Sequence, residues 1–354
     1  MTMGGLRAFV GDLRQLASVR RIVLDDGPEA GVRALAFSTG GGLDFWVLTD
    51  RSFDLGPVWF RGVPTAWQSP AGFRSPALHH PEEDGGRGFN RGFSGFLVTC
   101  GLDHVRQPAG GHPLHGRLPF TPARVTAYGE DWERPEPVLY GEGEVVQARY
   151  GGEALRLRRR IEAPIGGCEI RVEDEVENVG AEPSAQATLY HFNLGFPAAA
   201  AGTEIRIDGS SVFGPISLPD PQDQPASVSY PVGGRPWASC SVETPSEGGE
   251  HFQLTLGFAT ATLPYLQLWR DLRPNAGVLA VEPCTSERRP DGMSGPEAIL
   301  EPGERRRYSL RLQFAGSLAP IDRALLTGQV LVADLRAQNR GSAVGVQQAV
   351  QGRS

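Results

Sequence analysis

The feature that most constrains the fold is a two-residue alternation of apolar and polar side chains in short runs. It is clearest in Leu155-Arg156-Leu157-Arg158 and in Tyr308-Ser309-Leu310-Arg311-Leu312. Alternate residues of a β-strand face opposite sides, so a period of two indicates strands with one buried and one exposed face. Long helical heptads are missing, whereas 46 Gly and 29 Pro are available for turns. The chain is therefore predicted to be all-β.

Strand-like runs recur along the chain and are separated by turn signals such as Glu177-Asn178-Val179-Gly180. The expected strands are 32–37, 43–49, 57–60, 96–100, 123–128, 144–150, 154–163, 168–178, 190–196, 252–258, 266–269, 277–285 and 308–312. Leu13–Val19 is a short lead-in, and the stretch from Pro215 to Gly249 is loop-heavy. Ser69–Gly88 is too long for an ordinary connection and is predicted to form the rim or lid of a site.

The domain organisation follows from chain length and from the lack of a sharp linker or an internal repeat. A chain of 354 residues can bury a large core. Residues 1–320 are predicted to form a single large antiparallel β-sandwich whose broad concave sheet holds a ligand. Residues 321–354 are predicted to form a C-terminal helix and a flexible tail, because apolar residues recur at helical spacing from Ile321 to Asn339.

Charge and hydropathy exclude several classes of function. The net charge is −7, and all 34 basic residues are arginine. The triplets Arg158–Arg160 and Arg305–Arg307 lie in strand-like runs and are interpreted as solvated strand faces, so no nucleic acid partner is expected. No run of about 18 apolar residues exists, so no membrane partner is expected. Met1–Val10 lacks a signal-peptide core, and the predicted location is cytoplasmic.

Metal binding is not predicted. The four cysteines are widely spaced and form no CxxC pair, which argues against a zinc knuckle and fits reduced thiols. His112 and His115 are candidate metal ligands by spacing, but they lack a helix and an evident third ligand.

The most site-like pattern is the run Tyr190–Phe196. His191 and Asn193 lie two residues apart and share one strand face, while the residues between and beside them are apolar. Further along, the apolar run Gly277–Thr285 carries one carboxylate, Glu282. A histidine and a glutamate on separate strands are the smallest set of side chains that can act as general acid and general base on a sugar. Taken singly, the two residues are more often a satisfied core histidine and a loop-capping carboxylate.

Four motifs, in this order, resemble those of the aldose 1-epimerase (galactose mutarotase-like) superfamily. They are Thr99-Cys100-Gly101-Leu102-Asp103-His104, Leu114-His115-Gly116-Arg117, Tyr190-His191-Phe192-Asn193-Leu194-Gly195 and Leu279-Ala280-Val281-Glu282-Pro283. Each motif is weak alone, but together they span most of the chain. The chain looks like a less characterised branch with Cys-Gly-Leu-Asp, His-Gly-Arg and Tyr-His-Phe-Asn motifs. The resemblance implies a galactose mutarotase-like supersandwich that interconverts the anomers of an aldose.

The resemblance also implies roles for individual residues. His191 corresponds to the general acid and Glu282 to the general base, and His115 is expected to bind the sugar near its ring oxygen. The reaction requires no cofactor and no metal. The expected partner is a small-molecule sugar, and a homodimer is left open.

Further candidates for substrate binding lie in or near the motifs. Arg117 stands where the mutarotases commonly have a glycine, and Arg91 belongs to an Asn-Arg pair that matches another family motif. Asp271 is a candidate for gripping sugar hydroxyls, and Trp269 for lying under the sugar ring. The remaining candidates are Arg51 and Asn193. The alternatives are that the arginines only tie loops together, and that Trp269 and Trp67 are plain core.

The acid and the base are expected to reach one pocket. Their side chains should lie about 5–8 Å apart, so that they hold the C1–O5 edge of a sugar between them. The apolar residues Leu279, Ala280 and Val281 are expected to raise the pKa of Glu282 by desolvation.

Other functions and a modified substrate stay open. A non-catalytic carbohydrate-binding or sensing protein would use the same fold. A sugar hydrolase or lyase is a third alternative, although a glycosidase normally needs two carboxylates. Four arginines near the motifs favour a locally positive pocket and an acidic sugar, unless pairing with Asp54 and Asp103 leaves the pocket neutral. They are Arg51, Arg91, Arg106 and Arg117.

Overall fold

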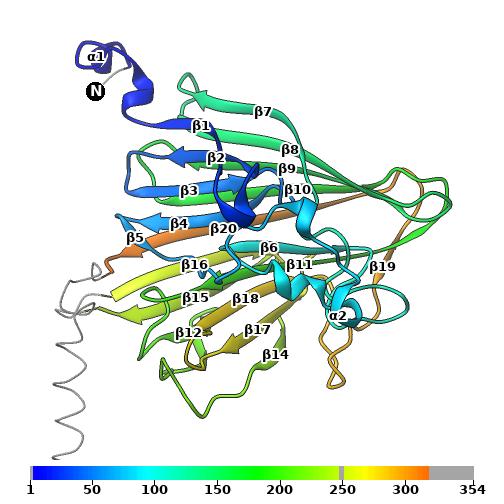
Figure 1. Ribbon diagram of the computed structural model, residues 1–354. Coiled ribbons are helices and arrows are strands. Elements are labelled where there is room, and N and C mark those ends of the chain that lie inside the picture. Colours follow the sequence, from blue (N-terminus) through cyan, green and yellow to red (C-terminus); the bar gives the residue numbers. More distant parts are fainter. Residues whose placement is uncertain (1–2, 247–250, 319–354) are drawn as a thin grey trace, which may run out of the picture. The chain divides into compact units, whose positions relative to one another are not determined.

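A computed structural model describes residues 3–246 and 251–318, which belong to one compact unit, Met1–Leu318 (Figure 1). The predicted C-terminal helix and tail, residues 321–354, lie outside the described residues. The domain boundary at residue 320 stays a prediction.

Strands dominate the described residues and pair antiparallel in three sheets, so the predicted all-β sandwich is confirmed. The five-stranded sheet has the order β1 (Ser18–Val23), β2 (Arg33–Ser38), β3 (Leu43–Leu48), β4 (Asp54–Phe60), β5 (Val63–Pro64). The nine-stranded sheet has the order β13 (Ser210–Phe213), β12 (Glu204–Ile207), β15 (Trp237–Pro245), β16 (His251–Ala259), β20 (Arg305–Gly316), β10 (Glu169–Asn178), β9 (Ala154–Pro164), β8 (Val138–Ala148), β7 (Arg124–Asp131). The six-stranded sheet has the order β14 (Ala226–Pro231), β17 (Tyr265–Asp271), β18 (Val278–Cys284), β11 (Ser184–Leu194), β19 (Ala298–Leu300), and β6 (Leu97–Leu102) also pairs with β11.

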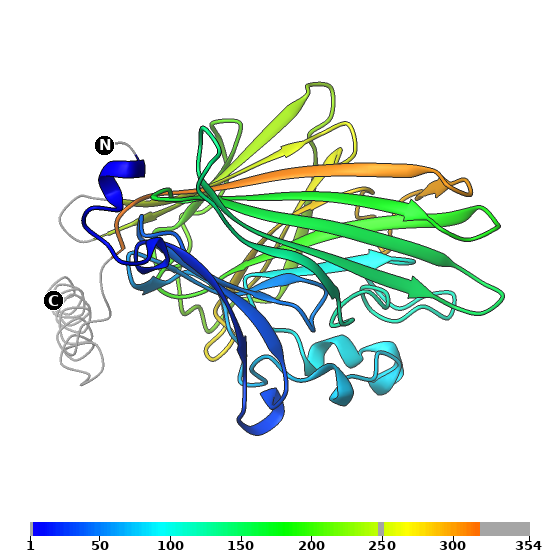
Figure 2. The ribbon, with the colours of Figure 1, turned by 90° about the horizontal axis from the view of Figure 1, so that it is seen from above.

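The main core lies between the nine-stranded sheet and a layer formed by the other two sheets. In Figure 2 the green and orange strands of the nine-stranded sheet lie on one side of the blue five-stranded sheet. Apolar residues from all three sheets meet in this core, for example Phe45 of β3, Ile161 of β9 and Phe192 of β11. Burying these faces supplies the main driving force for folding, at roughly 25 cal/mol per Å² of apolar surface.

Strand β9 shows how the alternation in sequence becomes two faces. Leu155, Leu157 and Ile161 are buried, whereas Arg158 projects to the solvent side. The interpretation of Arg158–Arg160 as a solvated face is wrong for Arg159, which is 2% exposed. Its neighbours face out, so the period of two turns the middle arginine inward.

Two strands occupy the stretch that was predicted to be loop-heavy, 215–249. They are β14 and β15, and the lead-in at Leu13–Val19 also runs into a strand, β1. The buried positions of β15 include the small residues Ala238 and Cys240, alternating with serine. Such residues give a weak strand signal on their own. Pairing with β12 and β16 on either side makes this segment a strand.

The six-stranded sheet has a second buried face, and the site lies on it. Val98 of β6, Leu189 of β11 and Cys284 of β18 form a smaller apolar cluster on this face, with Phe89 and Phe120 from the connecting segments packed on it. These segments, drawn in cyan in Figure 1, hold the short helix α2 (Glu83–Gly86) and several 3-10 turns. The only other α-helix among the described residues is α1 (Met3–Leu6). None of the described helices is long and apolar enough to cross a membrane.

Candidate active site

Strand register places three polar side chains in a row across the second face of the six-stranded sheet. Strands β11 and β18 pair with Leu189 opposite Cys284 and Phe192 opposite Val281, which sets His191 opposite Glu282. Strand β17 pairs with β18 so that Gln267 stands opposite Glu282. Cross-strand neighbours on one face are close enough to interact directly. The predicted acid and base are therefore brought together, with a glutamine as the third member.

Glu282 is fully buried and only half satisfied. Its Oε2 accepts a hydrogen bond of 2.6 Å from Gln267 Nε2. Its Oε1 has no hydrogen-bond partner in the described structure and lies 3.4 Å from His191 Nε2. Buried polar atoms are almost always hydrogen-bonded, so an orphaned carboxylate oxygen indicates a ligand position.

The predicted separation of about 5–8 Å between the acid and the base is wrong. The two side chains extend from opposed positions of adjacent strands, and their nearest atoms are 3.4 Å apart. His191 and Glu282 therefore stand side by side instead of on two sides of a sugar edge.

Asn193 fixes the imidazole of His191 from behind. Its Nδ2 donates to the carbonyl oxygens of Gly95 and His191, each at 3.0 Å, so its Oδ1 faces the ring. His191 Nδ1 lies 2.5 Å from this Oδ1 and must donate to it. Neutral His191 then carries its proton on Nδ1 and turns the lone pair of Nε2 toward Glu282. Asn193 is 0% exposed and positions the histidine; it does not line the cavity.

Burial shifts both groups toward their neutral forms. Desolvation raises the pKa of Glu282 to about 8, against the lowering effects of Arg106, the Gln267 hydrogen bond and Arg288. Desolvation lowers the pKa of His191 to about 4, against the hydrogen bond of Asn193. The predicted direction for Glu282 is confirmed. At neutral pH the pair therefore holds one exchangeable proton between Oε1 and Nε2.

A buried arginine supports Glu282 through Gln267. Arg106 Nε donates to Gln267 Oε1 at 3.0 Å. Its terminal nitrogens donate only to neutral acceptors, which are the Oγ atoms of Ser286 and Ser294, the carbonyl oxygen of Ser286 and the Sγ of Cys284. Arg106 is 3% exposed and forms no ion pair with a described carboxylate. It contributes a fixed positive field near Glu282.

His191 and Glu282 lie at a cavity of about 210 Å³ with aromatic walls. Ring centroids lie 5.0 Å from His191 for Phe93, 5.6 Å for Trp269 and 5.8 Å for His115. The volume is below the roughly 300–1,000 Å³ of drug-sized sites and suits a ligand as small as one sugar ring. The lining residues are Arg87, Phe89, Asn90, Phe93, Arg106, Gln107, Leu114, His115, His191, Ser227, Gln267, Trp269, Glu282, Arg288 and Gly292.

The His115-Gly116 step brings a second histidine to this cavity. Gly116 has φ +76, and a Cβ there would lie 2.4 Å from the carbonyl oxygens of Gly101 and His104, so only glycine fits. Desolvation by burial lowers the pKa of His115 well below its ordinary value, and His191 adds to this effect. A neutral His115 presents a hydrogen-bonding nitrogen to a ligand without adding charge.

Four other predicted residues do not line the cavity. Arg117 pairs with Asp103 at 2.9 Å, and Arg91 pairs with Asp84 at 2.7 Å. Asp271 is held by Arg273 at 2.7 Å. Arg51 is buried and donates to the carbonyl oxygens of Arg74 and Gly92, at 2.7 and 2.5 Å. For these arginines the alternative reading, that they tie loops together, describes their contacts.

Sequence reasoning missed Gln267, Phe93, Arg87 and Arg288 as site residues, and it named Arg106 only as one of four arginines that favour a positive pocket. Gln267 was detectable, because it interrupts the apolar run around it in the way that His191 interrupts its own strand. The others come from connecting segments, which no strand pattern aligns with the site. The end of the predicted rim loop, at Arg87, does reach the cavity.

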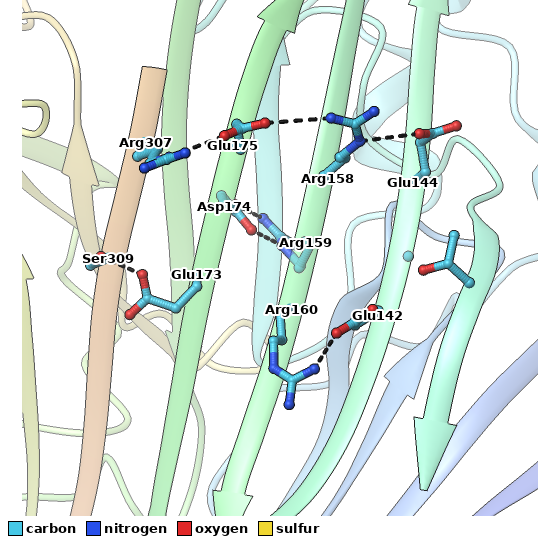
Figure 3. Close-up of a pocket in the computed structure, with 12 residues that line it drawn as sticks. Glu142, Glu144, Arg158, Arg159, Arg160, Glu173, Asp174, Glu175, Arg307 and Ser309 are labelled. Atoms are coloured by element: carbon cyan, nitrogen blue, oxygen red, sulfur yellow. Dashed lines mark hydrogen bonds and ion pairs between the residues drawn. The ribbon is translucent and has the colours of Figure 1, made fainter. Parts of the chain in front are cut away.

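A larger hollow of about 460 Å³ lies on the nine-stranded sheet (Figure 3). Carboxylates and guanidinium groups alternate there across the strands, with Arg158 between Glu144 and Glu175, and Arg307 on the other side of Glu175. These cross-strand pairs satisfy one another and leave no orphaned carboxylate among the residues that line the hollow. We therefore assign this surface to sheet stability. In the described part of the chain no group of three or more His, Cys, Asp or Glu residues is arranged to hold a metal ion.

Comparison with known protein families places the chain in a recognised group. Residues 29–223, more than half of the chain, match a domain of unknown function, DUF4432. The chain belongs to the DUF4432 family. No curated protein matches it by sequence.

Solved structures share the fold of this DUF4432 chain. A Klebsiella pneumoniae protein, provisionally assigned as an aldose 1-epimerase, matches with a TM-score of 0.69 and 19% identity over 85% of this chain and 86% of that one. A galactose mutarotase-like protein of Clostridium acetobutylicum matches with a TM-score of 0.58 and 14% identity over 84% and 98% of the two chains. The galactose 1-epimerase of Lactobacillus acidophilus matches with a TM-score of 0.50 and 12% identity, over 84% of this chain and 99% of that one. The resemblance to the galactose mutarotase-like superfamily is thus confirmed at the level of the fold.

Proposed function

We propose that the protein is an aldose 1-epimerase that opens and recloses the ring of a free or modified aldose. The observation that carries this proposal is the orphaned Oε1 of Glu282, buried beside His191 Nε2 at 3.4 Å in a sugar-sized cavity. Proteins with the same fold that are named as epimerases or mutarotases add support.

Ring opening removes the proton of the C1 hydroxyl and adds one to the ring oxygen. Both oxygens are bonded to C1, so a base and an acid that stand side by side can reach them together. Glu282 takes the hydroxyl proton, His191 Nε2 gives its proton to the ring oxygen, the C1–ring oxygen bond breaks, and a C1 carbonyl forms. Rotation about C1–C2 and reclosure with the roles reversed gives the other anomer.

One proton on the pair is enough for this cycle. Transfer of that proton from Glu282 to His191 Nε2 produces the ionised form that starts ring opening. Arg106 and Arg288 favour it, because their charges lower the pKa of Glu282 against the effect of burial. Ring opening returns the proton to Glu282, which is the form that burial favours at rest. The cycle uses proton transfers alone, so the proposal includes no cofactor.

The number of carboxylates favours an epimerase over a glycoside hydrolase. Hydrolysis of a glycosidic bond normally uses two carboxyl groups that flank the bond. Among the residues that line the cavity in the described part of the chain, Glu282 is the only carboxylate.

Anomer exchange measured by NMR on a panel of free sugars tests the proposal. The reaction should be faster with the protein than without it, after subtraction of the uncatalysed rate. Glu282→Gln and His191→Asn should each slow exchange by about two to four orders of magnitude with little change in sugar affinity. A matched control is Glu173→Gln, which changes a carboxylate on the nine-stranded sheet that bonds Ser309. It should leave the rate unchanged.

Two results would count against the proposal. Near-full exchange in both site variants would show that the pair does not carry out the chemistry. Sugar binding without any exchange in the unaltered protein would instead support the alternative of a carbohydrate-binding or sensing protein.

A further inference from the structure

The cavity is bordered by three arginines that no described carboxylate pairs with. They are Arg87 before the Gly88–Arg91 turn, Arg106 after strand β6 and Arg288 after strand β18. Elsewhere most of the described arginines near the site are neutralised, as Arg91 is by Asp84 and Arg117 by Asp103. A locally positive cavity thus occurs in a chain whose net charge is −7.

The three arginines differ in what they can do for a ligand. The N–H groups of Arg106 already donate to protein acceptors, so Arg106 offers a ligand the attraction of its positive charge and no free hydrogen-bond donor. Arg288 forms a single side-chain hydrogen bond, a long one of 3.4 Å to the carbonyl oxygen of Arg289. Arg87 forms none with the described residues and is exposed. The guanidinium groups of Arg87 and Arg288 are therefore available at the mouth of the cavity.

The charges at the site also favour an anionic ligand. Glu282, the single carboxylate among the described residues of the lining, is engaged by Gln267 and faces His191, and it forms no ion pair with Arg87 or Arg288. A guanidinium pairs best with a planar or multiply charged oxyanion, through two parallel hydrogen bonds. A ligand that brings such a group would satisfy donors that the protein leaves open.

We propose that the substrate is an aldose with an anionic substituent, a carboxylate, sulfonate or phosphate, remote from its anomeric carbon. The anomeric centre lies at His191 and Glu282, and the anion lies between Arg87 and Arg288. This inference rests on the proposed function, because it assigns the substrate class of the same site.

Binding of three matched probes tests the substrate class. Calorimetry would compare glucose, glucuronate and glucose 6-phosphate on the unaltered protein over a salt series. At least one anionic probe should bind about tenfold or more tightly than glucose, and this advantage should shrink as salt screens the arginines. Glucuronate and glucose 6-phosphate separate a carboxylate from a phosphate preference. Equal and salt-insensitive binding of all three would overturn the inference.

Variants of the mouth arginines locate the effect. Arg288→Gln and Arg87→Gln should each weaken the favoured anionic probe by about tenfold and weaken glucose by a clearly smaller factor. The control is Arg21→Gln, since Arg21 is an exposed and unpaired arginine on strand β1. It should change neither probe. Equal losses for glucose and for the anionic probe in the mouth variants would contradict anion recognition.

Anomer exchange on the same probes separates this inference from the proposed function. Fast exchange of glucose without preference for an anionic sugar would overturn the substrate class and leave the epimerase standing. Tight, salt-sensitive binding of an anionic probe without exchange would overturn the epimerase, and with it the assignment of that probe as a substrate. Preferred exchange of an anionic probe supports both.

Discussion

Two buried clusters of ionisable groups lie on opposite faces of strand β11. On the core face, Tyr190 donates to Asp174 at 2.7 Å, and Asp174 pairs with Arg159 at 2.6 Å. On the other face, the next residue, His191, meets Glu282. The core cluster is complete, because each of its charged groups has partners. The site cluster leaves an oxygen of Glu282 without one.

The difference shows how a buried charge that holds the fold is distinguished from one that meets a ligand. Arg159 bonds Asp174, Asp54 and Thr99, and Thr99 in turn bonds Asp54. Burial alone lowers the pKa of Arg159, and the two carboxylates more than offset this and raise it. Satisfied networks of this kind make a core rigid, whereas a half-satisfied network costs stability unless a ligand completes it.

Breaking the complete cluster should have the largest effect. Arg159→Met leaves Asp174 and Asp54 buried without their cation, so the free energy of unfolding should fall by about 3–5 kcal/mol. Urea denaturation measures this loss. The neighbouring change Arg158→Met removes an exposed arginine from the same strand and should cost about 1 kcal/mol or less. Equal losses in the two variants would show that the core cluster is not what stabilises the sandwich.

Completing the site cluster should raise stability. Glu282→Gln removes the desolvated carboxylate, and the new amide can donate to His191 Nε2 while its oxygen still accepts from Gln267. The folded pKa of Glu282 is about 8 and its ordinary value is 4.5, so the folded state holds the proton more tightly. The stability that the unaltered protein gains by holding this proton is fully present below pH 4.5 and is lost as pH rises through 8.

The free energy of unfolding of Glu282→Gln should therefore exceed that of the unaltered protein by an amount that grows between pH 4.5 and 8. It should reach on the order of 2–4 kcal/mol at pH 9, as urea denaturation at several pH values would show. The low pKa of His191 costs both proteins stability in acid and so cancels in the comparison. A gap that does not change with pH would contradict the burial of an ionisable Glu282.

The pH dependence of exchange should follow the single proton of the pair. A second proton binds below the His191 pKa of about 4, and the last is lost above the Glu282 pKa of about 8. Catalysed kcat/KM should be level between these values and fall by about tenfold per pH unit in alkali. NMR exchange rates from pH 5 to 10, corrected for buffer catalysis, would show the alkaline limb. A rate that rises steadily past pH 9 would rule out a required acid.

Loosening the support of Glu282 should have the smallest effect. Gln267→Met removes the hydrogen bond to Glu282 Oε2 and the acceptor of Arg106 Nε. We expect kcat to fall by about tenfold. The hydrogen bond from Gln267 lowers the pKa of Glu282, so its removal should raise this pKa and move the alkaline limb to higher pH. The matched control, Gln253→Met, removes a glutamine of strand β16 that donates a hydrogen bond to Glu243 of strand β15. A lower rate with an unmoved alkaline limb would mean that Gln267 acts on packing alone.

The sequence by itself determined the all-β fold and the acid–base pair as candidates. A period of two can be read along a chain because it follows from strand geometry alone, and it placed His191 and Asn193 on one face. It also implied that Arg159 faces inward, but a run of three arginines looks solvated until a partner such as Asp174 is found. The segment around β15 gave too weak a pattern, since its buried residues are small.

Only the tertiary structure decided which groups meet. The 3.4 Å contact of His191 with Glu282 depends on the register of β11 against β18, and Gln267 joins them through the register of β17. The positive mouth of the cavity depends on connecting segments that bring Arg87 and Arg288 to one place. Local patterns report the face on which a side chain lies. Register and loop paths, which are set by the packing of the whole core, fix its neighbours, and neighbours determine pKa, pairing and ligand.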